Sequence, residues 1–336
     1  MTEPASPRRV VCFGEMLLRL APPGRDLLLR TPHLETSFGG AETNVAVGLA
    51  RLGDEARMVT VLPDNAIGQA ALTELRRWGV DAGGVRIGRG RMGLYFLTPG
   101  AVLRPAEVPY DRTGSAFAGA APDLLDWTAE LEGAAWLHLS GITPAVSPNA
   151  ATAALSAVRA ARALGVQVSF DGNFRARVWA ERIGEAPAIL REIIAHADLA
   201  FIDHRDIGLI LGEMFDDPEA AARAAFDAFP ILTRIASTGR VIRGPEDHDL
   251  TGRLFARDGG HQTEMVRLNN IVDRVGAGDA FSAGVLHGLI AGQGEAAALD
   301  FGLACCALKH GIVGDFPLIT QDDVASFSAE HSDLKR

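Results

Sequence analysis

Residues 273–284, DRVGAGDAFSAG, place the carboxylate of Asp279 directly after two closely spaced glycines. Gly276 and Gly278 allow the backbone to turn so that successive N–H groups point outward, and a helix that begins here adds partial positive charge. In such a site Asp279 could accept a proton from a hydroxyl group while the N–H groups bind a phosphoryl group. Aspartate is also a common N-terminal helix cap. The segment alone therefore leaves a catalytic and a structural role open.

A second segment, residues 37–53, reads SFGGAETNVAVGLARLG. The paired glycines Gly39 and Gly40 bring bare backbone close to a ligand, and Asn44, one helical turn later, could present its amide to hydroxyl groups. The apolar residues of the following helix are expected to pack on a sheet. The glycines and Asn44 are therefore candidates for substrate binding.

Two familiar nucleotide-binding loops can be excluded. The GxxxxGK[ST] pattern of P-loop enzymes does not occur in the sequence. Residues 88–93, GRGRMG, match GxGxxG, but they lead into the strand-like LYFLT instead of a helix. A dinucleotide site is not expected there, because that motif requires a helix to follow the glycines.

Composition narrows the class of protein. The chain has 336 residues, 48% of them hydrophobic, and a net charge of −10, which is the wrong sign for a general nucleic-acid binder. The three cysteines form no disulfide framework, which suits a reducing, cytoplasmic location. No apolar stretch is long enough to span a membrane, and Glu15 and Arg19 interrupt the one near the N-terminus. Residues 10–13 are predicted to form a first strand, followed by a loop.

Strand-like and helical segments alternate along most of the chain, which predicts an α/β fold with a mainly parallel sheet and helices on both faces. Ligands of such sheets bind at the carboxyl ends of the strands. Asp171, Asp203 and the loop 273–279 are expected at such ends. The predicted strands cover 10–13, 57–62, 134–141, 166–171, 198–203 and 229–237, and the predicted helices 42–52, 67–78, 147–164 and 186–196.

Residues 25–40 and 88–113 break this alternation. They are rich in glycine, proline and arginine and contain only short strand-like pieces. We expect them to form a small β lid beside the main sheet, within a single domain of residues 1–336. Short lid strands leave exposed edges, which predicts pairing into a homodimer or a higher homo-oligomer.

Together the two glycine-containing segments closely resemble the signature regions of the ribokinase-like (PfkB) carbohydrate kinases. The late signature of that family, D-T-x-G-A-G-D, stands here as residues 273–279, DRVGAGD. The resemblance implies a ribokinase-like fold, with ATP and Mg²⁺ as cofactors. It also implies that Gly276, Ala277 and Gly278 form an anion hole and that Asp279 is the catalytic base. Arg274 replaces the family's threonine.

Within that family, four segments look most like kinases of 2-keto-3-deoxygluconate. They are GEMLLRLAPPG (14–24), residues 90–116, DGNFRARVW (171–179) and ALKHGIVGDFP (307–317). Such a sugar acid carries a carboxylate, which an acidic protein must hold with positive groups, and arginine binds carboxylates in a bidentate manner. The resemblance assigns the sugar-acid pocket to Gly39, Gly40, Asn44, Tyr95, Tyr110, Arg112, Arg175, Asp279 and Asp315.

The residues expected to bind the nucleotide match the family's motifs less well than those expected to bind the sugar. The resemblance places Asn173 and Arg175 between sugar and nucleotide, and Arg234, Ser237 and Gly239, with Gly276 and Gly278, at the nucleotide. Ala236 stands where the family has the first glycine of its nucleotide loop. The family's N-x-x-E element, linked to Mg²⁺, appears as residues 203–206, DHRD, so Asp203 and Asp206 would bind the metal through water.

The expected activity is ATP-dependent phosphorylation of the 6-hydroxyl of 2-keto-3-deoxygluconate, with neither nucleic acid nor membrane as a partner. One alternative is a kinase of a neutral sugar such as fructose or ribose, which would leave Tyr110, Arg112 and Arg175 without an anionic partner. A second is a non-catalytic sugar-acid-binding protein, suggested by Ala236 and the altered residues 203–206.

Overall fold

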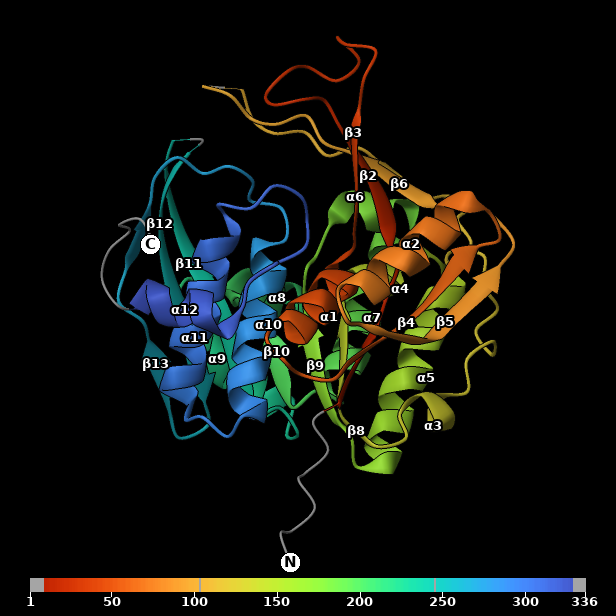
Figure 1. Ribbon diagram of the computed structural model, residues 1–336. Coiled ribbons are helices and arrows are strands. Elements are labelled where there is room, and N and C mark those ends of the chain that lie inside the picture. The colour runs from red at the N-terminus through yellow and green to blue at the C-terminus, as the bar shows by residue number, and fades with distance from the viewer. Residues whose placement is uncertain (1–8, 103, 245, 329–336) are drawn as a thin grey trace, which may run out of the picture.

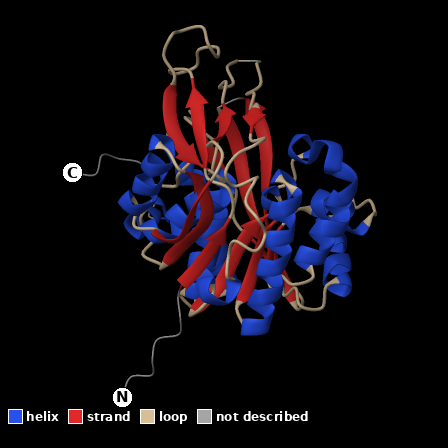
Figure 2. Cartoon of the chain, turned by 90° about the vertical axis from the view of Figure 1, so that its right-hand side faces the viewer, coloured by secondary structure: helices blue, strands red, loops and turns tan. Residues whose placement is uncertain are grey.

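The computed structural model describes residues 9–102, 104–244 and 246–328. Its centre is a large twisted sheet with helices on both faces, and a smaller sheet projects beyond the ends of the strands of the large sheet (Figures 1 and 2). This confirms the predicted α/β architecture. No helix of the described residues is long and apolar enough to cross a membrane.

The large sheet is mainly parallel. Seven strands pair in parallel: β11, β10, β9, β8, β1, β4 and β5. Beyond β11, the strands β12, β13 and β14 pair in antiparallel orientation. The order across the sheet is β13 (Gly259–Gln262), β12 (Asp247–Ala256), β11 (Arg234–Gly244), β10 (Leu199–Phe201), β9 (Gln167–Asp171), β8 (Ala134–Ser140), β1 (Arg9–Phe13), β4 (Ala56–Pro63) and β5 (Asp81–Gly88), with β14 (Val266–Leu268) paired to β12.

Alternation along each strand divides the core into two layers. In β1, Val11 and Phe13 belong to one hydrophobic cluster, and Val10 and Cys12 belong to the other, as the period of two requires. The first layer is covered by α3 (Trp127–Glu130), α4 (Ile142–Val146), α5 (Pro148–Leu164), α6 (Ala176–Trp179), α7 (Ala186–Ile194), α8 (His204–Leu211) and α9 (Pro218–Ala228). The second is covered by α1 (Ala41–Arg51), α2 (Ala66–Arg77), α10 (Ala277–Ile290) and α11 (Glu295–Lys309), with α12 (Gln321–Ser328) packed on α11.

The small sheet has the strand order β3 (Glu35–Gly39), β2 (Leu17–Ala21), β6 (Gly93–Phe96) and β7 (Tyr110–Asp111), and it stands at the top of Figure 1. The separate small sheet was predicted, but β2 was not, because residues 14–24 were expected to form a loop. The alternating burial of residues 17–21 shows why they form a strand: every second side chain packs inward.

The strand predicted at 229–237 was also misplaced. β11 begins at Arg234 and continues without a loop to Gly244, where it turns back into β12. The residues before it, 230–233, form a turn after Phe229. The segment expected to carry a nucleotide-binding loop is therefore part of a long β-hairpin.

The chain changes direction in the middle of the large sheet. From β1 it proceeds outward through β4 and β5, then returns to β8 on the other side of β1 and continues outward through β9, β10 and β11. Such a reversal leaves a crevice outside the carboxyl ends of the two central strands, and open α/β sheets bind ligands there. The small sheet begins directly after β1 and therefore lies over this crevice.

Candidate active site

Asp279 and Asn44 meet across the crevice although 235 positions separate them in the chain. The Asn44 side-chain N–H donates to Asp279 Oδ2 at 2.6 Å. Asn44 lies in the first turn of α1 and Asp279 in the first turn of α10, so two helix N-termini face the same point. Asn44 Oδ1 is buried and has no partner among the described residues. The pair therefore leaves a carbonyl acceptor and a carboxylate oxygen without a hydrogen-bond partner in the described protein.

The start of α10 resolves the alternative of a simple helix cap. Gly276 is the N-cap residue, with a left-handed φ of 82°, and no side chain caps this helix. A Cβ at Gly276 would lie 2.1 Å from the Asp315 carbonyl oxygen, so only glycine fits there. A Cβ at Gly278 would meet nothing within 4 Å. The amides at the start of α10 therefore have open space beside them, and the carboxylate of Asp279 is free for another role.

Burial, assisted by the nearby carboxylates of Asp315 and Glu42, raises the pKa of Asp279 from 3.8 to about 7, although the hydrogen bond from Asn44 opposes the shift. A carboxyl group with this pKa exchanges protons near neutral pH, as an efficient general base must. Perturbed pKa values of this kind are typical of functional sites.

Glu42 underlies this pair and was missed in the sequence. It is 1% exposed, and its Oε1 accepts bonds from the Ser140 N–H (2.9 Å), the Ser140 hydroxyl (2.7 Å) and the Thr143 hydroxyl (2.7 Å). A Cβ at Gly14, directly after β1, would lie 2.1 Å from Glu42 Oε2. Glu42 thus joins α1 to the ends of β1 and β8 at the point where the strand order reverses.

Asp315 lies at the base of the small sheet in a buried network. The Tyr95 hydroxyl donates to both of its carboxylate oxygens, at 2.5 and 2.6 Å, and Arg19 Nη1 lies 3.1 Å from Oδ1. Arg19 also forms an ion pair with Asp273 at 2.7 Å. Burial raises the pKa of Asp315 although Arg19 opposes this shift. The network connects β2 and β6 of the small sheet to the loop before α10.

Arg19 was not recognised as a site residue, because its position was expected to lie in a loop. A single charge inside the alternating run LLRLA was the one available signal. The predicted glycines Gly39 and Gly40 lie close to other parts of the protein. A Cβ at Gly39 would lie 2.0 Å from Asp315 Oδ2, and one at Gly40 2.3 Å from the Glu15 carbonyl oxygen. Gly39 thus brings its backbone against the carboxylate of Asp315, and Gly40 against the backbone of Glu15.

Arg112 and Tyr110 lie together at the end of β7, in the small sheet. The Arg112 guanidinium lies 5.7 Å from the Tyr110 ring centroid, and the Tyr110 ring lies 5.9 Å from that of Tyr95. Arg112 is buried and its Nε bonds to the carboxylate of Glu15 at 2.6 Å. Glu15 thus holds the guanidinium by one edge and leaves its terminal nitrogens available.

Arg175 and Asn173 follow β9 on the opposite side of the crevice. Arg175 is exposed, and its one bond is from Nη1 to the adjacent Phe174 carbonyl, so no described carboxylate pairs with it. Asn173 adopts a left-handed φ of 35°, and its N–H donates to Asp171 Oδ1. Burial raises the pKa of Asp171 well above its usual value, with Asp279 and Asp206 adding to the rise. Arg175 is therefore a free cation beside a cluster of acids.

The candidate metal residues Asp203 and Asp206 form a capping box at the start of α8. Asp203 pairs with Arg205, and Asp206 Oδ2 accepts the Asp203 N–H at 3.1 Å. The described residues contain no cluster of three or more His, Cys, Asp or Glu side chains that could hold a metal. Mg²⁺ is commonly held by one or two carboxylates together with substrate phosphates and water. Asp203 and Asp206 fit that arrangement, and the described residues do not form a site in which protein side chains alone surround the ion.

The nucleotide candidates lie along β11. Ser237 and Gly239 line a cavity of about 260 Å³ between β11 and α8, together with Asp203 and Arg205. Arg234 is committed elsewhere, because its Nε pairs with Glu295 at 2.6 Å. Ala236 is fully buried in the sheet. The structure therefore brings Ser237 and Gly239 to this cavity and keeps Arg234 in an ion pair with α11.

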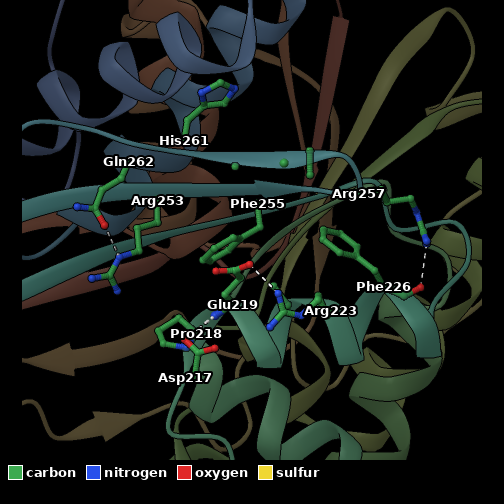
Figure 3. A pocket seen from close by; sticks show the side chains of 14 residues that line it. Asp217, Pro218, Glu219, Arg223, Phe226, Arg253, Phe255, Arg257, His261 and Gln262 are labelled. Carbon is green, nitrogen blue, oxygen red and sulfur yellow. Dashed lines mark hydrogen bonds and ion pairs between the residues drawn. The ribbon is translucent and has the colours of Figure 1, made fainter.

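A larger cavity, of about 650 Å³, lies between α9, β12 and β13 (Figure 3). Its charged side chains already have partners: Arg223 pairs with Glu219, Arg253 bonds to Gln262, and Arg257 donates to carbonyl oxygens that include that of Phe226. None of the predicted site residues lines it. Its size alone therefore gives no reason to place the active site there.

The fold and the acid–amide pair at the start of α10 agree with the family that the chain matches. The chain belongs to the pfkB family of carbohydrate kinases, whose sequence model matches residues 7–314. It is therefore a sugar kinase, a phosphotransferase with an alcohol group as acceptor. This confirms the resemblance found in the two glycine-containing segments.

Individual relatives narrow the comparison. A 2-dehydro-3-deoxygalactonokinase of Haloferax volcanii is 35% identical over 94% of this chain and 95% of its own. A 2-dehydro-3-deoxygluconokinase of Bacillus subtilis is 28% identical over 94% of each chain. The crystal structure of the 2-dehydro-3-deoxygluconokinase of Thermotoga maritima superposes with a TM-score of 0.91 at 33% identity, covering 96% of this chain and 99% of that one.

Proposed function

We propose that the protein transfers the γ-phosphoryl group of ATP to the 6-hydroxyl of 2-keto-3-deoxygluconate (2-dehydro-3-deoxy-D-gluconate). The observation that carries this proposal is the Asn44–Asp279 pair, in which a carboxyl group of pKa about 7 lies at the uncapped start of α10. A base, an anion-binding helix terminus and an open approach to both are what phosphoryl transfer to a hydroxyl requires.

The protein groups take distinct roles in the proposed reaction. Asp279 accepts the hydroxyl proton, and Asn44 holds the carboxylate in place through Oδ2. The amides of residues 276–279 bind the anion that arrives at the start of α10. Asp203 and Asp206 would hold Mg²⁺ through water, and the ion would supply charge neutralisation for the phosphates. The small sheet covers the crevice and excludes water, which would otherwise compete as an acceptor.

Two arginines favour a sugar acid over a neutral sugar. Arg175 has no carboxylate partner among the described residues, and Arg112 is held by Glu15 through Nε alone. A guanidinium can bind a carboxylate with two parallel hydrogen bonds. The relatives named for 2-dehydro-3-deoxy sugar acids support the same class. The galactonate epimer is the second candidate, because the relative named for it is 35% identical.

A substrate panel tests the proposal. ADP release is measured with Mg²⁺-ATP and the gluconate keto acid, its galactonate epimer, fructose or ribose, and phosphorus NMR locates the phosphate on the product. We expect a keto acid to be phosphorylated at the 6-position with the highest kcat/KM. Arg175→Met should raise KM for the keto acid about tenfold or more, since a charge-assisted hydrogen bond contributes about 1.5–3 kcal/mol. A higher kcat/KM for fructose or ribose would refute the assignment.

The edge strands β3 and β7 of the small sheet support a proposal on assembly. Each has an unpaired side among the described residues, and such edges are normally covered. We propose that two small sheets pair in a homodimer. Light scattering after size-exclusion chromatography should give twice the chain mass of 35.5 kDa, and a monomer at micromolar concentration would refute the pairing.

A further inference from the structure

Lys309, the last residue of α11, is a fully buried lysine, with a relative exposure of 0%. The sequence contains only two lysines, Lys309 and Lys335, among 32 lysine and arginine residues. The chain thus uses arginine at nearly every basic position but keeps lysine where the side chain is enclosed. Lysine is a compact point charge, whereas arginine carries a wide planar fork. The site therefore has room for an ammonium group in particular.

The surroundings of Lys309 place it behind the anion hole. Its Nζ donates to the Ile312 carbonyl at 2.9 Å, which closes the turn after α11. A Cβ built on Gly276 would lie 3.4 Å from Lys309 Cε, so the lysine stem packs against the N-cap residue of α10. No described carboxylate lies within ion-pair distance of Nζ, although Asp273, Asp315 and Asp279 all act on its charge.

The neighbouring charges explain why a cation is tolerated there. Asp273 and Asp315 are both paired with Arg19, so two acids face two cations, Arg19 and Lys309, in one buried cluster. Burial lowers the pKa of Lys309, and the carboxylates of Asp273 and Asp315 oppose that shift. An unpaired buried ammonium is costly for folding. Strongly perturbed ionisable groups are concentrated at functional sites.

We propose that Lys309 is a fixed cation behind the anion hole, which stabilises the negative charge of the transferred phosphoryl group and holds the turn before Asp315 against Gly276. This inference rests on the proposed kinase reaction and adds a residue that neither signature motif contains. Lys309 acts through space and through Gly276, so it is a positioning residue and touches no reacting atom. At an effective dielectric constant near 20, the interaction of two unit charges separated by roughly one nanometre or less corresponds to about a 10–100-fold change in rate.

Three variants test this proposal. Lys309→Met fills the space without charge, Lys309→Ala leaves a space for an added cation, and Arg159→Met removes an exposed charge of α5 as the matched control. We expect Lys309→Met to lower kcat about 10–100-fold and to change KM for the sugar less than about threefold. Added ammonium or methylammonium should raise kcat of Lys309→Ala at least about tenfold and should leave kcat of Lys309→Met unchanged.

A lysine that only supports the fold would behave differently. A kcat within threefold of wild type in Lys309→Met would overturn the proposal, and so would a loss in Lys309→Ala that no added cation restores. If Lys309→Ala does not fold, Lys309→Met and the next measurement decide.

Calorimetry with Mg²⁺, ADP and aluminium fluoride, a mimic of the transferring phosphoryl group, needs no turnover. We expect Lys309→Met to bind this mixture at least about tenfold more weakly than wild type while binding ADP alone equally well. Equal binding of the mixture by both proteins overturns the role of Lys309 and leaves the kinase proposal intact. A wild-type protein that binds neither ADP nor the mixture contradicts the kinase proposal itself.

Discussion

Replacement of Asp279 by asparagine tests the proposed proton acceptor while the contact with Asn44 is kept. The asparagine carbonyl can still accept the Asn44 N–H that now reaches Oδ2 at 2.6 Å, so the geometry of the pair is retained. The substituted side chain cannot accept the substrate proton. Loss of general-base catalysis costs about 10²–10⁴ in rate, or about 2.7–5.4 kcal/mol in activation free energy. We expect kcat to fall by that factor, while KM for the sugar acid stays within about threefold of wild type.

The same substitution should stabilise the protein, and the sign follows from the pKa of Asp279. The folded state raises this pKa from 3.8 to about 7, so between these values the folded chain holds a proton that the unfolded chain has lost. The free energy of unfolding therefore decreases as pH rises through this window, and the full cost is present above pH 7. Three pKa units correspond to at most about 4 kcal/mol. Asp279→Asn avoids this cost.

The assays are steady-state kinetics from pH 5.5 to 9 and urea unfolding at pH 8 and pH 4. In the wild-type protein kcat/KM should fall about tenfold per pH unit below pH 7, because only the ionised base is active. In Asp279→Asn this dependence should disappear, and the gain in unfolding free energy at pH 8 should vanish near pH 4. Near-normal turnover in Asp279→Asn, or a lower stability than wild type at pH 8, would refute the role of Asp279.

Three further substitutions probe the surroundings of the base. Asn44→Ala removes the hydrogen bond that lowers the pKa of Asp279, so the midpoint of the kcat/KM profile should move to higher pH; an unchanged midpoint would contradict the contact. Gly276→Ala places a Cβ 2.1 Å from the Asp315 carbonyl oxygen, and it should lower kcat about 100-fold because the amides at the start of α10 are displaced. A Cβ at Gly278 meets nothing within 4 Å, so Gly278→Ala should unfold in urea at the same concentration as wild type. Arg19→Met removes the guanidinium that pairs with both Asp273 and Asp315, and it should lower the free energy of unfolding in urea by about 3–5 kcal/mol. A loss below about 1 kcal/mol would contradict a stabilising role for these two ion pairs.

Sequence patterns predicted the parts of this site that depend on local structure. The alternation of strands and helices placed Asp171 and Asp203 at strand ends, and the glycines before Asp279 predicted the helix start. Arg19 could not be found in this way, because its acidic partner Asp315 lies 296 positions away and no local pattern records that contact. Lys309 was hidden for a similar reason, inside an apolar helix whose burial becomes evident only when α10 packs on it.

The proposal that Asp279 is the base is supported by the hydrogen bonds that the nearby acids already accept. Glu42 Oε1 already accepts three hydrogen bonds, and its Oε2 packs against Gly14. Both oxygens of Asp315 accept the Tyr95 hydroxyl, and Arg19 holds one of them as well. Asp279 accepts one bond, at Oδ2, and its Oδ1 has no partner among the described residues. A proton acceptor needs an uncommitted oxygen within reach of the substrate. Of these three acids Asp279 alone combines an oxygen without a hydrogen bond with a place at the uncapped helix terminus where the phosphoryl group would bind.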